Sequence, residues 1–145
     1  MHWHLSIPIE VLSTRSSQGP PAGIKIDIFF LELLAIVSAI HHAGSLAQLP
    51  RQLLIWTDSL DSVAVLNSLH AVESLHNAPL LAIAGIILQT RMDLHVRFIK
   101  GKMNTCTDML SCLLVDKYQR KFPSNRVERF APPRELLPAQ WRECF

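Results

Sequence analysis

The sequence lacks the cysteine pairs and the long apolar runs that mark several classes of protein. Its three cysteines, Cys106, Cys112 and Cys144, form no C-x-x-C pair, which argues against a disulfide framework and against a zinc ribbon. This cysteine content favours a reducing, intracellular setting, in either cytoplasm or nucleus. The apolar runs at 28–40 and 78–88 are shorter than the roughly 18 residues of a membrane-spanning helix. We therefore predict buried helices and no membrane partner.

Charged residues are also few, and their signs are unevenly distributed. They make up 18% of the 145 residues, and hydrophobic residues make up 49%, which is typical of a folded domain. The net charge is +2, but residues 1–90 carry a net −3 and residues 91–145 a net +5. A basic second part suits binding to a polyanion such as nucleic acid, although a solvated basic surface gives the same pattern. The first five residues lack the basic and apolar stretches of a secretory signal.

Hydrophobic periodicity predicts an α/β fold with a small, mixed sheet flanked by helices. In chain order we expect a strand at 2–9, a loop at 13–23, a strand at 24–26, a helix at 28–42, a strand at 53–57, helices at 59–69 and 79–89, a strand at 94–99 and a last helix at 104–118. Asp27 is the expected N-cap of the first helix, and Gly44 its stop. The apolar run LLIWT predicts a strand covered on both faces, with Trp56 in the core.

Three carboxylates lie in otherwise apolar elements, namely Glu32, Asp58 and Asp108. A charge in such surroundings costs several kcal/mol unless it is paired or bound to a metal. Asp58 and Asp108 could serve as acids at helix N-termini, and Glu32 could lie at the rim of the sheet. The alternative is a cluster that binds Mg²⁺, because this ion prefers carboxylate oxygens and a pair of such ions can hydrolyse a phosphodiester.

Other candidate residues favour structural roles. The histidine pairs at 2 and 4 and at 41 and 42 have no third ligand at a fixed spacing, which argues against zinc. Ser59 suits a helix cap better than a nucleophile, because no histidine has a predictable position beside it. Trp3 and Trp141 could stack on bases, but packing suits them better.

Three segments resemble the ribonuclease H-like domain of retrotransposon reverse transcriptases, most closely those of fungal elements. They are IFFLELLAIVSAI (28–40), LLIWTDSLDSVAVLNSL (53–69) and LHVRFIKGKMNTCTDMLSCLL (94–114). The pattern G-K-x-N-x-x-x-D-x-L-S at 101–111 is the most specific part of a resemblance that covers residues 24–118. The segment PPRELLPAQWR is also similar to the family.

The resemblance implies a ribonuclease H-like domain over residues 1–118, incomplete at its N-terminus, followed by a Pro- and Arg-rich tail at 119–145 with at most a short helix near 134–137. It implies an endonuclease that hydrolyses the RNA strand of an RNA/DNA hybrid with two Mg²⁺ ions. Of the four carboxylates that the family uses for metal binding and catalysis, Glu32 matches the second, Asp58 the third and Asp108 the fourth.

The first carboxylate of the family has no counterpart in this sequence. Only Glu10 and Asp27 are acidic before Glu32, and Asp27 is better explained as the helix cap. The family has three antiparallel strands there, and this chain has room for about two, so we expect the first strand to be missing. Losing that aspartate, which bridges both metals in the family, would weaken metal binding and leave the other acids repelling one another.

Smaller departures from the family support the same conclusion. Phe98 stands where many relatives have a histidine, and strand alternation turns His95 toward the other face. Thr107 and Cys112 also depart from the usual residue types. We therefore predict a domain of this ancestry that is inactive or weakly active. The alternatives are a remnant that binds nucleic acid through its basic second part, and a structural or interaction module with no activity of its own.

Overall fold

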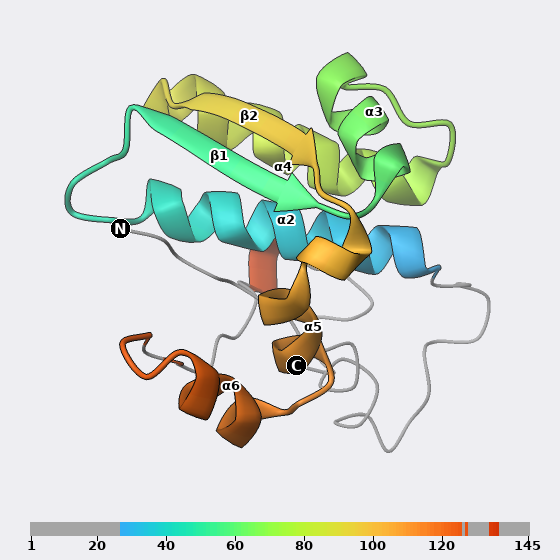
Figure 1. Cartoon of the computed structure of the whole chain (residues 1–145). Coiled ribbons are helices and arrows are strands. Elements are labelled where there is room, and N and C mark those ends of the chain that lie inside the picture. The colour runs from blue at the N-terminus through green and yellow to red at the C-terminus, as the bar shows by residue number, and fades with distance from the viewer. Residues whose placement is uncertain (1–26, 126, 128–133, 137–145) are drawn as a thin grey trace.

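A computed structural model describes residues 27–125, 127 and 134–136 of the chain (Figure 1). Its elements are the helices α2 (Ile28–Gly44), α3 (Leu60–Ser68), α4 (Ser74–Thr90), α5 (Thr105–Ser111) and α6 (Val115–Lys121), the strands β1 (Gln52–Thr57) and β2 (Asp93–Phe98), and the 3₁₀ turns η1 (Gly101–Met103) and η2 (Arg134–Leu136). The segments predicted at 2–9, 13–23 and 24–26 lie outside the described residues. The fold is mixed α/β, which confirms the predicted class. No helix in the described part is long and apolar enough to span a membrane.

The described sheet consists of β1 and β2, which pair in parallel. Gln52 lies opposite Asp93 at one end of the pair, and Thr57 lies opposite Phe98 at the other. Parallel strands need a long connection, and here α3 and α4 provide it. Both strands therefore end at the same edge of the sheet. In Figure 1, α2 and α4 lie side by side on one side of the two strands.

The core lies between α2, α4 and the inward side of the strands. Helix α2 contributes a stripe of side chains with no exposed surface: Phe30, Leu33, Leu34, Val37 and Ile40. Their spacing is that of one helix face, which explains why this very apolar segment forms a buried helix. Ile83 of α4 and Val96 of β2 are buried against the same cluster.

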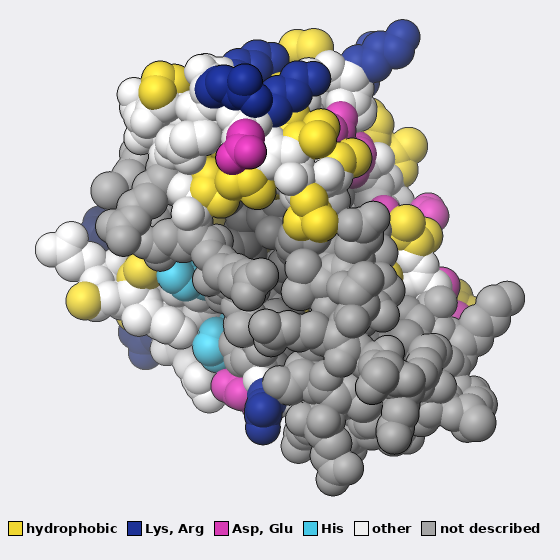
Figure 2. Space-filling view, turned by 90° about the horizontal axis from the view of Figure 1, so that it is seen from below, with side chains coloured by type: hydrophobic (Ala, Val, Ile, Leu, Met, Phe, Trp, Pro, Cys, Tyr) yellow, Lys and Arg dark blue, Asp and Glu magenta, His cyan; other side chains and the backbone are white. Residues whose placement is uncertain are grey.

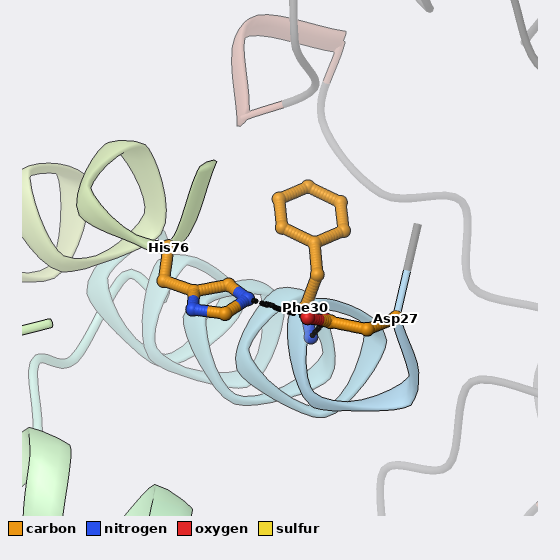
Figure 3. Close-up of polar contacts among 3 residues, drawn as sticks. All are labelled: Asp27, Phe30 and His76. Atoms are coloured by element: carbon orange, nitrogen blue, oxygen red, sulfur yellow. Dashed lines mark hydrogen bonds and ion pairs between the residues drawn. The ribbon is translucent and has the colours of Figure 1, made fainter. Parts of the chain in front are cut away.

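The first helix begins as predicted, with Asp27 as its N-cap. The Asp27 carboxylate accepts a hydrogen bond of 2.7 Å from the Phe30 amide. It also lies 3.1 Å from Nε2 of His76, a buried side chain on the first turn of α4 (Figure 3). Phe29 contacts the same imidazole edge-to-face, at 4.7 Å between the ring centres. Helix α4 begins at Ser74 rather than at the predicted residue 79, and this earlier turn is the one that carries His76 to Asp27.

Two opposing effects act on the pKa of Asp27. Partial burial raises this pKa, but the hydrogen bond from the Phe30 amide and the contact with His76 outweigh burial. The pKa of the carboxyl group therefore lies below its usual value. Because the folded chain holds the ionised form more firmly than the unfolded chain does, Asp27 stabilises the fold above the ordinary aspartate pKa of about 3.9.

This carboxylate gives a prediction about acid stability. We expect Asp27→Asn, which keeps an oxygen for the Phe30 amide but loses the charge, to be less stable than the wild type above about pH 4. The difference should shrink as the pH falls through the lowered pKa of Asp27. Asp27→Ala should lose about 1 kcal/mol of cap energy as well. Urea unfolding across this range measures both effects, with Asp61→Asn, an exposed aspartate, as the control. A pH-independent difference for Asp27→Asn would contradict the prediction.

Strand β1 corrects one prediction from the sequence. The run LLIWT was expected to be covered on both faces, but the exposure alternates along β1. Leu53 and Ile55 pack against the core, whereas Leu54 is 48% exposed and Trp56 is 51% exposed. The placement of Trp56 in the core was therefore wrong. The apolar content of a strand does not show how many of its faces are covered, because burial depends on which elements pack there.

The helix predicted at 104–118 is two helices, α5 and α6. The chain turns at Leu113, whose φ of 57° is in the left-handed region. The Leu113 amide donates to the Leu110 carbonyl, and the Leu114 amide donates to the Met109 carbonyl. This pair of bonds is the Schellman motif that ends many helices, usually with glycine at the left-handed position. Because leucine occupies this position, the amino-acid pattern contained no stop signal for the helix.

A similar left-handed residue ends α4 and yields a stability prediction. Arg91 has a φ of 55°, is exposed, and donates its amide to the Ile87 carbonyl. Because only glycine adopts this conformation without strain, we expect Arg91→Gly to raise the free energy of unfolding by roughly 0.5–1 kcal/mol. Gln89→Gly, inside the last turn of the same helix, should lower it by about 1 kcal/mol. Thermal unfolding of both variants tests this, and destabilisation by both would refute it.

Candidate functional site

The candidate site is built on the segment where β1 passes into α3. Ser59 is the N-cap of α3, and its hydroxyl oxygen accepts a hydrogen bond of 3.2 Å from the Ser62 amide. The Ser59 amide in turn donates to the Thr57 hydroxyl at 3.2 Å. Asp58, between them, is exposed and lies one residue before the cap. The predicted capping role at this helix therefore belongs to Ser59, and the Asp58 carboxylate is left at the surface of the turn.

Glu32 reaches this same segment from α2. Its Oε2 accepts a hydrogen bond of 3.3 Å from the hydroxyl of Ser62, a residue with no exposed surface. The Ser62 hydroxyl lies 3.0 Å from the Ser59 hydroxyl. A carboxylate only accepts, so the consistent order is Ser59 donating to Ser62 and Ser62 donating to Glu32. The half-buried charge of Glu32 is thus accommodated by a hydroxyl and by the N-terminal end of α3.

Asp58 faces the turn that follows β2. A Cβ atom added to Gly101 would lie 3.7 Å from the Asp58 Oδ2, so this carboxylate lies directly beside the glycine. The two strands are also joined beyond their ends, because the Ile99 amide donates to the Thr57 carbonyl at 2.9 Å. The carboxyl-terminal edge of the sheet therefore brings Asp58 next to the start of the G-K-x-N motif.

Asp108 lies on α5, the helix that follows this turn. It is in the first turn of α5, and its amide donates to the Asn104 carbonyl at 3.1 Å. Asn104, at the N-cap position of α5, makes no side-chain capping bond. The three predicted acids are thus carried by α2, by the end of β1 and by α5, and the contacts of Glu32 and Asp58 place these two near the sheet edge where β1 and β2 end.

The donor chemistry of these residues is that of a Mg²⁺ site, since all three are carboxylates. Their placement does not complete such a site. Within the described residues, no three His, Cys, Asp or Glu side chains lie close enough together to hold a metal ion. Glu32 instead has a hydroxyl partner in Ser62. The assignment of Glu32, Asp58 and Asp108 as metal ligands and catalytic residues therefore stays a prediction from the resemblance.

The histidines do not complete the site either. His95 is exposed on β2 and lies 3.0 Å from Asp93 through its Nε2, whereas its neighbour Val96 is buried. This alternation confirms that His95 points away from the face of the sheet that carries Val96. His41 lies 3.6 Å from Glu135 of η2, far along the chain from the site. His2 and His4 lie outside the described residues.

Sequence reasoning missed Ser62 and His76, the partners of two acids that it did single out. Ser62 follows Ser59 by one helical turn, and this serine pair was the available signal. His76 gave no comparable signal, because its partner Asp27 is 49 residues away in the chain.

Comparison with models of known protein families, with curated proteins and with solved structures gave no match.

The bond between Ser62 and Glu32 gives a testable coupling. We expect Ser62→Ala to lower the free energy of unfolding by about 1–3 kcal/mol, because Glu32 loses its partner while half-buried. The cost should be smaller in a Glu32→Gln background, where no charge remains. A double-mutant cycle by urea unfolding measures the coupling. Ser68→Ala is the control, because that hydroxyl is exposed and bonds only the Val65 carbonyl of its own helix. Equal costs in both backgrounds would rule the coupling out.

Proposed function

We propose that this chain is a ribonuclease H-like domain of retrotransposon origin that binds an RNA/DNA hybrid, with weak or absent hydrolysis of the RNA strand. The binding site is the edge where β1 and β2 end. The alternative that the sequence leaves open is a module that interacts with another protein.

The observation that carries the proposal is that two of the predicted acids lie near the same edge of the sheet. Glu32 bonds Ser62 in the first turn of α3, and Asp58 lies beside Gly101 at the first residue of η1. These residues come from three segments that the resemblance treats as parts of one site. Ligands of open parallel sheets bind in general beyond the carboxyl ends of the strands, which is this edge.

Positive charge is available beside the acids. Lys100 and Lys102 are both exposed and flank Gly101, so they stand within one residue of the backbone that Asp58 approaches. Cations at this position suit contacts to the phosphates of a duplex, which are a major source of affinity for nucleic acids. More Lys and Arg side chains gather at one edge of the face in Figure 2. The exposed cations of α6 are Lys117, Arg120 and Lys121.

Weak turnover follows from the incomplete acid set. Two-metal hydrolysis needs several carboxylates converging on both ions. Glu32, Asp58 and Asp108 are the residues by which this chain would hold Mg²⁺, but they form no three-ligand group within the described residues. The first acid of the family also has no counterpart in the sequence. The proposal therefore assigns this chain binding rather than efficient cleavage.

One observation favours the interaction module as a second candidate. Leu54 and Trp56 are large apolar side chains and about half exposed on β1. Exposed apolar surface of this kind is a common feature of protein-binding faces. The module would use that surface for a protein partner and would not need Glu32 or Asp58.

Hybrid binding gives the first test of the proposal. We expect the full chain to bind a labelled RNA/DNA hybrid with an affinity that falls steeply with salt. Replacing Lys100 and Lys102 together with alanine should reduce the slope of log K against log salt by about 2, since each phosphate contact contributes about 0.9. The double variant Lys117→Ala and Lys121→Ala on α6, which removes the same charge, is the matched control. Absent or salt-insensitive binding would refute the proposal, and a larger loss for the α6 pair would move the site to α6.

Cleavage gives the second test. Incubated with the labelled hybrid and Mg²⁺, the wild type should release product little faster than Asp58→Asn does, because the acid set is incomplete. Asp58 is exposed, so this substitution should leave stability within about 0.5 kcal/mol of the wild type. Efficient cleavage by the wild type that Asp58→Asn abolishes would overturn the claim of weak turnover, while supporting the site.

A further inference from the structure

The outward face of the two strands presents a combination of side chains that the proposed hybrid site does not use. Gln52, Leu54 and Trp56 alternate outward along β1, and Asp93, His95 and Arg97 do so along β2. The register places Trp56 directly beside Arg97, and Leu54 directly beside His95. Helices α2 and α4 lie on the other side of the strands (Figure 1). An exposed indole therefore has a cation as its cross-strand neighbour.

Charge is ordered along this face. At the start of the strands, Asp93 is engaged by His95 at 3.0 Å and by Gln52 at 3.5 Å. Arg97 lies four residues further along β2, about 13 Å away at the usual rise of a strand. The exposed Lys100 and Lys102 continue beyond the strand end. The Trp56 end of the face therefore carries Arg97, and Asp93, the one acid among the six outward strand side chains described, lies at the other end with partners of its own.

We propose that this face binds single-stranded nucleic acid, with a base stacked on Trp56 and the adjoining phosphates held by Arg97 and Lys100. A sheet face that carries an exposed aromatic ring beside cations is a general way to hold unpaired bases, because every base offers a flat π-face. The face shares Lys100 with the proposed hybrid site at the strand ends, but its other side chains are different, and it needs neither Mg²⁺ nor a carboxylate.

A protein partner fits this face less well. Only two of its six outward side chains are apolar, and Asp93, His95 and Arg97 form one of its two rows. A stable protein interface buries about 800 Å² on each partner around an apolar centre depleted of charge. Two strands with a charged row offer a narrow strip instead, which matches the width of a single strand of nucleic acid better than that of a protein surface.

The test is binding of labelled oligo(U) and oligo(dT) to the full chain in EDTA, followed by fluorescence anisotropy. We expect Trp56→Ala to weaken binding about ten-fold, and Trp56→Phe to retain most of it because a ring remains. Arg97→Gln should reduce the slope of log K against log salt by about 0.7, the contribution of one phosphate contact in a single strand. Leu81→Ala, which removes an exposed apolar side chain from α4, and Arg91→Gln, which removes an equal charge, are the controls and should have smaller effects.

Several outcomes would overturn the inference. Equal binding by Trp56→Ala and the wild type would do so, as would absence of binding by the wild type. If Trp56→Ala instead converts a dimer to a monomer without changing nucleic-acid affinity, the face joins two copies of the chain. Trp56→Ala should leave binding of the RNA/DNA hybrid at the strand ends unchanged, so a failure of the hybrid site and a failure of this face give different results. Circular dichroism and thermal unfolding of each variant exclude loss of the fold as the cause.

Discussion

Burial of helix α2 is the constraint on which the rest of the described structure depends. Its apolar stripe packs against α4, and α2 also contacts α3, β1 and η2. The end of β1 and the start of α3, which carry Asp58 and Ser62, are therefore positioned by this one helix. Removing a fully buried side chain such as Phe30 would cost about 3–5 kcal/mol, a large part of the stability of a small domain.

The same burial explains the form of the candidate site. Glu32 is a charge on the helix that provides most of the core, so it needs a partner at the rim, and the Ser62 hydroxyl provides one. That contact ties α2 to the first turn of α3, directly after the strand end that carries Asp58. The acids approach one edge because the packing of α2 and the parallel pairing of β1 with β2 bring their elements there.

Local signals in the sequence predicted much of this fold. Asp27 was identified as a cap because a short acceptor precedes an apolar helix, and the Phe30 amide binds it. The ends of β1 and β2 were predicted to within one residue, because turn residues follow them. The break at Leu113 and the exposure of Trp56 could not be predicted. The first needs a leucine in a conformation typical of glycine, and the second depends on which elements cover a strand face.

The candidate site was predictable in composition but not in contacts. Glu32, Asp58 and Asp108 stand out as charges in apolar elements, and the structure brings Glu32 and Asp58 toward one sheet edge. Their spacing in the chain does not reveal that the Ser62 hydroxyl donates to the Glu32 carboxylate, or that Gly101 lies against Asp58. Both contacts join segments that are distant in sequence, and only the packing of α2 and the pairing of the strands brings them together.

The contacts at the two ends of α2 and α4 have an electrostatic consequence. Asp27 before α2 meets His76 in the first turn of α4, and Gly44 at the end of α2 lies against Ile86 and Thr90 near the end of α4. The two helices therefore run in the same direction, and their dipoles lie side by side with like ends together. Such an arrangement concentrates positive potential where both helices begin. The carboxylate of Asp27 lies at that shared end and offsets part of this potential, and Glu73 at the N-cap position of α4 adds a second anion.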